Sequence, residues 1–166
     1  MRKLLLAVAR DDRASPSAEM ALSLPLMLAL IFGAFELGNY FMTEHKVVKA
    51  VRDGARYAAR RPFTDYTGCA PSAELIDDTR NVTRTGQLTS GGTPRVGSWT
   101  DPTSITVTAA CDTSGAYTGI YVTSVEGTPV VTVAATVPYT SILGQLGLAD
   151  VTLGLNARSQ AAVTGI

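Results

Sequence analysis

Few residues of this sequence have a type and spacing that could do chemistry. His45 is the only histidine among 166 residues, so no histidine pair can bind a metal ion and no second histidine can act as a base. The sequence contains no Gly-x-Ser-x-Gly, no P-loop and no dinucleotide-binding glycine motif. Asp77 and Asp78 suit the start of a helix better than acid–base work. We therefore expect a non-enzymatic protein with no catalytic residue, no metal site and no cofactor.

Two cysteines are the remaining candidates for covalent chemistry. Cys69 and Cys111 are 42 positions apart, which is too far for a CxxC redox or zinc pair. In an exported domain the two can form a disulfide, whose loop closure would contribute about 4 kcal/mol in the chain-entropy model. In a cytoplasmic domain they would instead be two buried free thiols. The spacing alone leaves both alternatives open.

The element that precedes these residues is an uninterrupted apolar run. Residues 20–35 carry no charge and lie between Glu19 and Glu36, and the apolar and aromatic residues that follow extend the segment to about residue 42. Such a length can cross a bilayer. Pro25 removes one helical N–H donor and is expected to bend the helix. A buried core helix would show a polar stripe, and a cleaved signal peptide would show a better small-x-small site. We therefore favour a retained membrane anchor over both alternatives.

The helix is expected to continue beyond the membrane through residues 43–61. Small and β-branched residues recur there on one narrow face, at Val47, Val51, Gly54, Ala55 and Ala58. Basic residues line another face, at Lys49, Arg52, Arg56 and Arg60. Nothing breaks the pattern until Arg61 and Pro62. One long helix over roughly residues 17–60 is the central structural prediction.

After Pro62 the composition changes to Thr, Gly, Ser and Val, which is typical of a β-rich domain. A short helix is predicted from Ser72 to about Arg84, and residues 88–101 are predicted to form a loop. Alternating apolar residues predict antiparallel strands over residues 103–110, 116–125, 129–137 and 151–163. Three or four such strands need a partner for their apolar face, and the amphipathic half of the long helix can supply it. The predicted fold class is α+β, a long helix packed on a small antiparallel sheet.

The net charge of zero conceals a polarised chain. Residues 1–61 hold 10 basic and 6 acidic groups, whereas residues 62–166 hold 4 basic and 8 acidic groups. The balance argues against a nucleic-acid binder, which usually carries a basic excess. Basic residues occur on both sides of the apolar run, and a literal positive-inside count places the C-terminal domain in the cytoplasm. That rule weakens for a long following domain, and we favour export because of the Thr-rich β region and its two cysteines.

The stretch from about Arg13 to Arg61 resembles the N-terminus of TadE-like proteins, minor pseudopilins of tight-adherence (Tad/Flp, type IVc) pilus systems. The resemblance lies in Ala18-Glu19 before the apolar run, in Leu24-Pro25-Leu26, in Phe32-Gly33 with Glu36-Leu37-Gly38, and in residues 53–60, DGARYAAR. Residues 130–139 and 151–162 look like the closing strands of that family. The motifs are short, but their order and spacing are moderately specific.

The resemblance implies four segments: a cytoplasmic basic leader at residues 1–14, a transmembrane helix at 15–42, its amphipathic continuation at 43–61, and an extracytoplasmic α+β head at 62–166. In prepilin-like proteins a prepilin peptidase cuts the leader so that a glutamate becomes the fifth mature residue. That rule places the cleaved bond between Ala14 and Ser15 and makes Glu19 the fifth residue. Glu19 would then pair with the amino terminus of a neighbouring subunit and set axial register, and Glu36 would contact another subunit's helix.

The implied function is assembly, initiation or tip formation of a Tad pilus by a single-pass protein of the bacterial inner membrane, with its N-terminus cytoplasmic and its head periplasmic. The implied partners are membrane lipid, other pilins and pseudopilins, Tad inner-membrane assembly proteins and the prepilin peptidase. The alternative from the residues alone is a membrane-anchored extracytoplasmic module that binds a ligand or surface and does not enter a filament.

Overall fold

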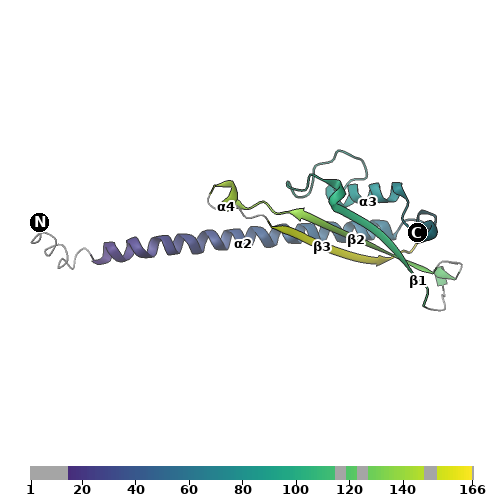
Figure 1. The fold of residues 1–166 in the computed structure, drawn as a ribbon, viewed down its shortest axis with the longest axis horizontal. Helices are drawn as coiled ribbons and strands as arrows, with labels where there is room; N and C mark the ends of the chain where they lie inside the picture. Colours follow the sequence, from purple (N-terminus) through teal and green to yellow (C-terminus); the bar gives the residue numbers. More distant parts are fainter. Residues whose placement is uncertain (1–14, 115–118, 123–126, 148–152, 166) are drawn as a thin grey trace, which may run out of the picture. The chain divides into compact units, whose positions relative to one another are not determined.

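The structure is a computed structural model that describes residues 15–114, 119–122, 127–147 and 153–165 (Figure 1). The predicted leader at residues 1–14 lies outside the described residues. The chain divides into two compact units, one that ends at Asn39 and one that begins at Tyr40. Each unit is described by itself, and the second is called the head below.

The first described element is α2, an α-helix over Ser15–Ala59 that passes from the first unit into the head. Leucine, alanine and methionine dominate its first half, and all three are strong helix formers. The helix continues through Pro25. Near this point the Ser23 hydroxyl donates to the Glu19 carbonyl at 2.8 Å, so this polar side chain is satisfied within the helix. The prediction of one long helix is confirmed.

The head contains a three-stranded antiparallel sheet in the order β1-β2-β3 (Figure 1). The strands are β1 (Ile105–Asp112), β2 (Thr128–Pro138) and β3 (Gly154–Ala162). The register places Val107 opposite Val133 and Val133 opposite Ser159. Alternation along each strand directs one set of side chains into the core and the other set outward. Three of the predicted strands are therefore confirmed, as is the α+β fold.

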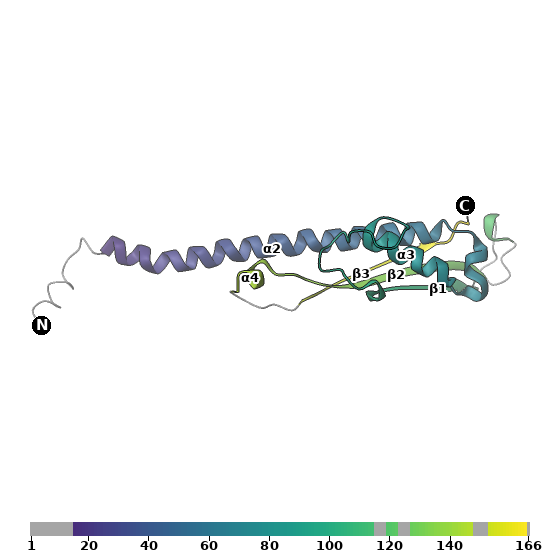
Figure 2. The same ribbon diagram turned by 90° about the horizontal axis from the view of Figure 1, so that it is seen from above.

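The core of the head lies between the sheet and two helices. The second half of α2 buries the face predicted for it, and α3 (Ala73–Thr85) lies beside it (Figure 2). Gly54 permits this close approach, because a Cβ there would overlap the Thr83 hydroxyl and lie 3.2 Å from Thr83 Cβ. The sheet side of the core consists of buried β-branched and aliphatic residues, which include Ile105, Val107, Val131, Val133, Ala135, Val137 and Leu155.

Helix α3 begins and ends as the sequence predicts. The Ser72 side chain accepts a hydrogen bond from the Leu75 N–H at 3.2 Å, which satisfies one of the free donors of the first turn. Gly86 ends the helix in the left-handed region with φ 79°, and its N–H donates to the Val82 carbonyl. The predicted helix of residues 72–84 is thus confirmed within one residue at each end.

One predicted strand is wrong over the residues that the structure describes. Within residues 116–125 the structure describes residues 119–122, and there Gly119–Tyr121 form a short 3-10 helix, η4. Gly119 has φ 66°, which no extended strand allows. The Tyr121 hydroxyl donates to the Val163 carbonyl at 2.7 Å and its ring meets Phe63 edge to face. Tyr121 is therefore held by its side chain, while β2 pairs directly with β1.

Three further short helices complete the described chain. They are η2 (Phe63–Cys69) after the long helix, η3 (Pro102–Ser104) before β1, and α4 (Ile142–Gln145) after β2. The predicted loop of residues 88–101 contains no helix or strand. It still contributes to the core, because Trp99 is buried and its indole N–H donates to the Ser104 hydroxyl at 2.9 Å.

Candidate membrane-spanning and assembly site

The first half of α2 exposes apolar side chains around its whole circumference. An 18-residue window in this helix reaches a mean hydropathy of 2.0, and none of that window is buried. The exposed large apolar residues of the first unit are Met20, Leu22, Leu24, Leu26, Met27, Leu28, Leu30, Ile31, Phe32, Phe35 and Leu37. A helix that is apolar on all sides is stable only inside lipid or a protein core. No part of this window is buried, so it does not form the core of the described chain, and its length and composition are consistent with a membrane anchor.

The two glutamates of the apolar half lie at its ends. Glu19 is exposed and Glu36 is half-buried. Their separation of 17 positions corresponds to about 26 Å of helix, close to the roughly 30 Å of a hydrocarbon core. The structure therefore places the two carboxylates toward opposite edges of a span and does not bring them together. Ser15 is the first residue of α2, and Ala14 lies outside the described residues.

The second half of α2 changes its surroundings over a few residues. Tyr40 is half-buried, and its ring meets Tyr139 edge to face with centroids 5.3 Å apart. From Val47 onward the apolar face is fully buried in the head. The opposite face is exposed and carries His45 and the basic residues. The helix thus has an apolar circumference before Tyr40 and an amphipathic one after it.

The end of α2 is fixed by two hydrogen bonds from residues outside the helix. The Tyr66 hydroxyl donates to the Ala58 carbonyl at 2.6 Å, and the Thr164 N–H donates to the Ala59 carbonyl at 2.7 Å. These bonds satisfy carbonyls that the last turn of a helix leaves without partners. Burial raises the pKa of the Tyr66 hydroxyl well above its usual value, so this donor stays protonated at physiological pH.

A disulfide joins Cys69 to Cys111, with their Cα atoms 5.8 Å apart. Cys69 is the last residue of η2, and Cys111 lies on β1 near its end. The bond therefore ties the segment that follows the long helix to an edge strand of the sheet. Of the predicted site residues, these two are the pair that the structure brings together.

Two polar contacts between α2 and the rest of the head were not predicted from the sequence. Asp53 accepts an ion-paired hydrogen bond from Arg95 at 2.7 Å, and the Tyr57 hydroxyl donates to Asp78 at 2.9 Å. Desolvation, followed by the Asp78 carboxylate, raises the pKa of Tyr57. The partners are 42 and 21 positions apart, so no local pattern could have revealed them.

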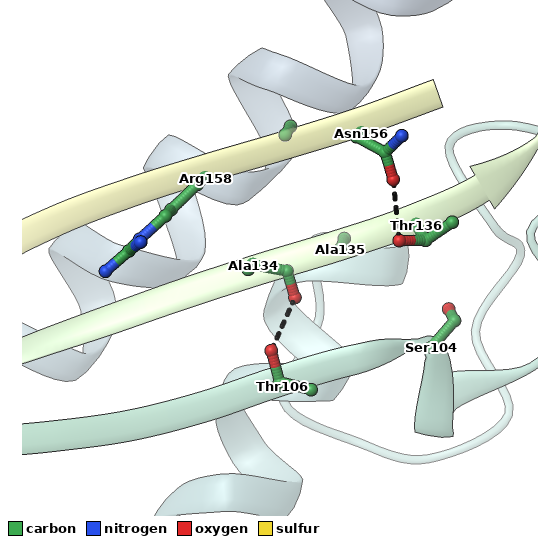
Figure 3. Close-up of a pocket in the computed structure, with 8 residues that line it drawn as sticks. Ser104, Thr106, Ala134, Ala135, Thr136, Asn156 and Arg158 are labelled. Carbon is green, nitrogen blue, oxygen red and sulfur yellow. Dashed lines mark hydrogen bonds between the residues drawn. The ribbon is translucent and has the colours of Figure 1, made fainter. Parts of the chain in front are cut away.

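The outward face of the sheet is polar and open (Figure 3). Thr136 donates to the Asn156 side chain at 2.8 Å, and Gln160 donates to Thr132 at 3.0 Å across the same pair of strands. Arg158 extends from β3 over this face. Among the described residues no three His, Cys, Asp or Glu side chains gather as a metal site would require. The face can offer hydrogen bonds and one positive charge to a ligand.

Comparison with known proteins agrees with the N-terminal segment. The family model described as TadE-like protein matches residues 17–56. This range contains Glu19, Glu36 and most of α2. The match confirms the resemblance seen in the sequence. The match points to a protein associated with the Tad pilus machinery. No curated protein and no solved structure matches the chain.

Proposed function

We propose that this protein is a non-enzymatic minor pseudopilin that acts in the assembly or initiation of a Tad pilus, or at its tip. It is anchored in the bacterial inner membrane by the first half of α2, and its head is periplasmic. Its partners are other pilins and pseudopilins, the inner-membrane assembly proteins of the Tad system, membrane lipid and a prepilin peptidase.

The observation that carries this proposal is the two-part character of α2. One helix exposes large apolar side chains between Met20 and Leu37 and contributes buried residues to the core of the head from Val47 onward. A simple anchor needs only a span and a linker. Here the proposed span and part of the head's core belong to one helix, Ser15–Ala59, with no linker between them. This arrangement suits a subunit that is moved from the membrane into an assembly.

The roles of Ala14, Ser15 and Glu19 follow from the family pattern. We propose that the peptidase cuts between Ala14 and Ser15, so that Glu19 becomes the fifth residue of the mature chain. A carboxylate within a membrane is stable when a cation is close to it. The free amino terminus of a neighbouring mature chain is such a cation, and their pairing would set the axial position of one subunit against the next. Glu36 is proposed to contact a second subunit's helix deeper in the bundle.

The decisive experiment is the intact mass of the protein purified from cells with and without the prepilin peptidase. The proposal expects the chain to lose residues 1–14 only when the peptidase is present. A full-length chain in both strains would refute the processing step, and a shorter chain in both would indicate a different protease. A chain with Ala14→Phe is the matched control, because a bulky residue at the cleaved bond should block removal in the peptidase-positive strain.

A second candidate function is a membrane-anchored module that binds a ligand or surface and stays outside the filament. The open polar face of the sheet favours it, since Thr106, Asn156 and Arg158 line one shallow hollow there (Figure 3). Purified pili distinguish the two functions. If the protein is a pseudopilin, deleting it is expected to lower pilus number, and purified pili can contain the protein. If it is a binding module outside the filament, deleting it is expected to leave pilus number unchanged.

A further inference from the structure

The second half of α2 runs along the sheet from one end of the head to the other. At one end the Tyr40 ring meets the ring of Tyr139, which follows the end of β2, with centroids 5.3 Å apart. At the other end the Ala59 carbonyl accepts the N–H of Thr164, which follows β3, at 2.7 Å. The apolar half of α2 precedes Tyr40 in the chain. The proposed span therefore joins the head at its Tyr139 end, which is called the proximal end below.

The proximal end exposes large apolar side chains. Leu146 and Leu153 are 60% and 47% exposed, and Phe41 and Met42 of α2 are 50% and 62% exposed. Leu153 belongs to this end because its carbonyl accepts the Tyr139 N–H at 2.8 Å. Leu146 directly follows α4, which lies beyond the ends of β2 and β3 in both views (Figure 1, Figure 2).

The segments that supply most of these side chains carry no charge. Residues 37–43 of α2 and residues 138–149 contain no Asp, Glu, Lys or Arg. Asp150 is the first charged residue after the second segment, and Glu44 is the first after the other. Uncharged apolar surface at the point where a membrane helix leaves the bilayer is suited to contact with lipid.

The turn that contains α4 is also suited to a surrounding with little water, because its backbone donors are bonded within the turn. The Ser141 hydroxyl accepts the Gly144 N–H at 3.0 Å, and the Ser141 carbonyl accepts the Gln145 N–H at 3.2 Å. The Leu146 N–H donates to the Ile142 carbonyl at 3.2 Å. Hydrocarbon offers no partner to an unpaired N–H, so these bonds remove the main cost of bringing the turn to lipid.

We propose that Leu146 and Leu153 enter the bilayer surface beside the span, so that the head has a second contact with the membrane besides α2. Tyr40 and Tyr139 then lie at the level of the headgroups, where aromatic side chains gather. The inference rests on the proposed membrane anchoring, because the span brings the proximal end to the bilayer. Contacts through both α2 and the α4 turn restrict how the head tilts and rotates relative to the membrane.

The depth of these residues follows from α2. Tyr40 lies two positions before Met42, the last residue of the predicted span, which is about 3 Å along the helix axis. The headgroup region on each side of a bilayer is about 5–7 Å thick. For a helix that stands across the bilayer, Tyr40 therefore lies near the boundary of the hydrocarbon. The ring contact with Tyr139, and the bond from Tyr139 to Leu153, hold Leu153 close to the same depth.

The test uses the full-length chain in phosphatidylcholine nanodiscs that hold a single copy each. One cysteine at a time is introduced and labelled with the fluorophore NBD, while the disulfide stays oxidised. Leu146→Cys and Leu153→Cys report the proximal end. Ile120→Cys is the matched control, because Ile120 is 55% exposed and lies in η4, which is bonded to the opposite end of the head through Tyr121. Leu30→Cys reports the span itself.

The labels at Leu146 and Leu153 are expected to be quenched by lipid that carries a nitroxide group. They are also expected to be at least about threefold less accessible to aqueous iodide than the label at Ile120, because a charge is strongly disfavoured in hydrocarbon. The label at Ile120 should show the opposite behaviour with both quenchers.

Two outcomes would overturn the inference. In the first, the labels at Leu146 and Leu153 are as accessible to iodide as the label at Ile120. In the second, they are protected only when several copies share a nanodisc, because the leucines would then pack against a second copy.

The label at Leu30 separates this inference from the anchor on which it rests. A Leu30 label in lipid, with both proximal labels in water, refutes the second contact and leaves the anchor standing. A Leu30 label in water refutes the anchor and the second contact with it.

Discussion

Glu19 is the residue on which the assembly proposal depends most. It is exposed at the beginning of the apolar half of α2, where a carboxylate is tolerated, whereas at the bilayer centre a charged residue would cost about 2.5–3.5 kcal/mol. Glu19→Ala is expected to leave membrane insertion intact, because alanine only raises the hydropathy of the span. Pilus number should fall to near zero, because the partner of the neighbouring amino terminus is lost.

Membrane fractionation and counting of pili by electron microscopy measure the two effects. Glu44→Ala is the matched control, since Glu44 lies on the same helix beyond the apolar half and should leave pilus number unchanged. Normal piliation in Glu19→Ala would remove the proposed role of Glu19, and failure of insertion would show that Glu19 serves the anchor instead.

Gly54 is the residue on which the packing of the head depends most. A Cβ at this position would overlap the Thr83 hydroxyl and approach Thr83 Cβ at 3.2 Å. Because the added methyl group would overlap a buried side chain, Gly54→Ala is expected to lower the free energy of unfolding by about 1–3 kcal/mol, the usual cost of overpacking. Alanine has the higher helix propensity, so a loss of stability would come from this contact alone.

Urea unfolding of the full-length chain, followed by circular dichroism, measures the loss. Gly97→Ala is the matched control, because a Cβ at Gly97 meets nothing within 4 Å, and it should change stability by less than about 0.5 kcal/mol. Combining Gly54→Ala with Thr83→Ala removes the hydroxyl and should recover part of the loss. A stabilised Gly54→Ala chain would contradict the packing of α2 against α3.

At the scale of elements, the disulfide connects the end of the long helix to the sheet. η2 carries Cys69 and β1 carries Cys111, and the 42-residue separation corresponds to about 4 kcal/mol of loop-closure free energy in the chain-entropy model. Cys69→Ser with Cys111→Ser is expected to lower unfolding free energy by about 2–4 kcal/mol. Reductant should destabilise the wild-type chain and leave the double variant unaffected. Equal stability of the wild-type chain with and without reductant would contradict the prediction.

The elements that could be predicted from the sequence are those whose causes are local. Ser72 and Gly86 mark the two ends of α3 by capping chemistry that acts within four residues. The buried face of α2 repeats with the period of a helix, and β1 and β2 alternate with the period of a strand. In each case the periodicity of apolar residues reflects which side chains face the core, so the periodicity was sufficient to predict the element.

The features that the sequence did not reveal have distant causes. Residues 119–121 form η4, and the Tyr121 hydroxyl there donates to the Val163 carbonyl 42 positions away. The Asp53–Arg95 ion pair and the Tyr57–Asp78 hydrogen bond join α2 to segments that the fold alone brings close. The sequence also could not decide whether Cys69 and Cys111 pair, because a 42-residue spacing is compatible with both pairing and separation.

At the scale of the whole molecule, the charge asymmetry follows the structure. The excess of positive charge in residues 1–61 includes the exposed basic residues of α2, and the excess of negative charge in residues 62–166 includes the carboxylates of α3 and β1. The basic residues of the second half of α2 and the carboxylates of α3 and β1 belong to the same unit, so the charge boundary near Pro62 lies within one domain.

The distribution of basic residues around the apolar run also predicts on which side of the membrane the head lies. Counting basic residues within 20 positions of the span gives Arg2, Lys3, Arg10 and Arg13 before it and Lys46, Lys49, Arg52, Arg56, Arg60 and Arg61 after it, which taken literally directs the head to the cytoplasm. Charge is a poor guide where a long domain is translocated, and a disulfide persists in an oxidising compartment. We therefore expect a periplasmic head.

Protease protection measures this orientation. Proteinase K added to spheroplasts is expected to degrade an epitope placed after Ile166, and the same treatment of intact cells is expected to leave it whole, because the outer membrane excludes the enzyme. A matched chain with Lys46→Gln and Lys49→Gln removes two of the basic residues nearest the span. It should keep the same orientation if the long head decides translocation. Protection of the wild-type epitope in spheroplasts would place the head in the cytoplasm, where neither the disulfide nor assembly outside the membrane could be maintained.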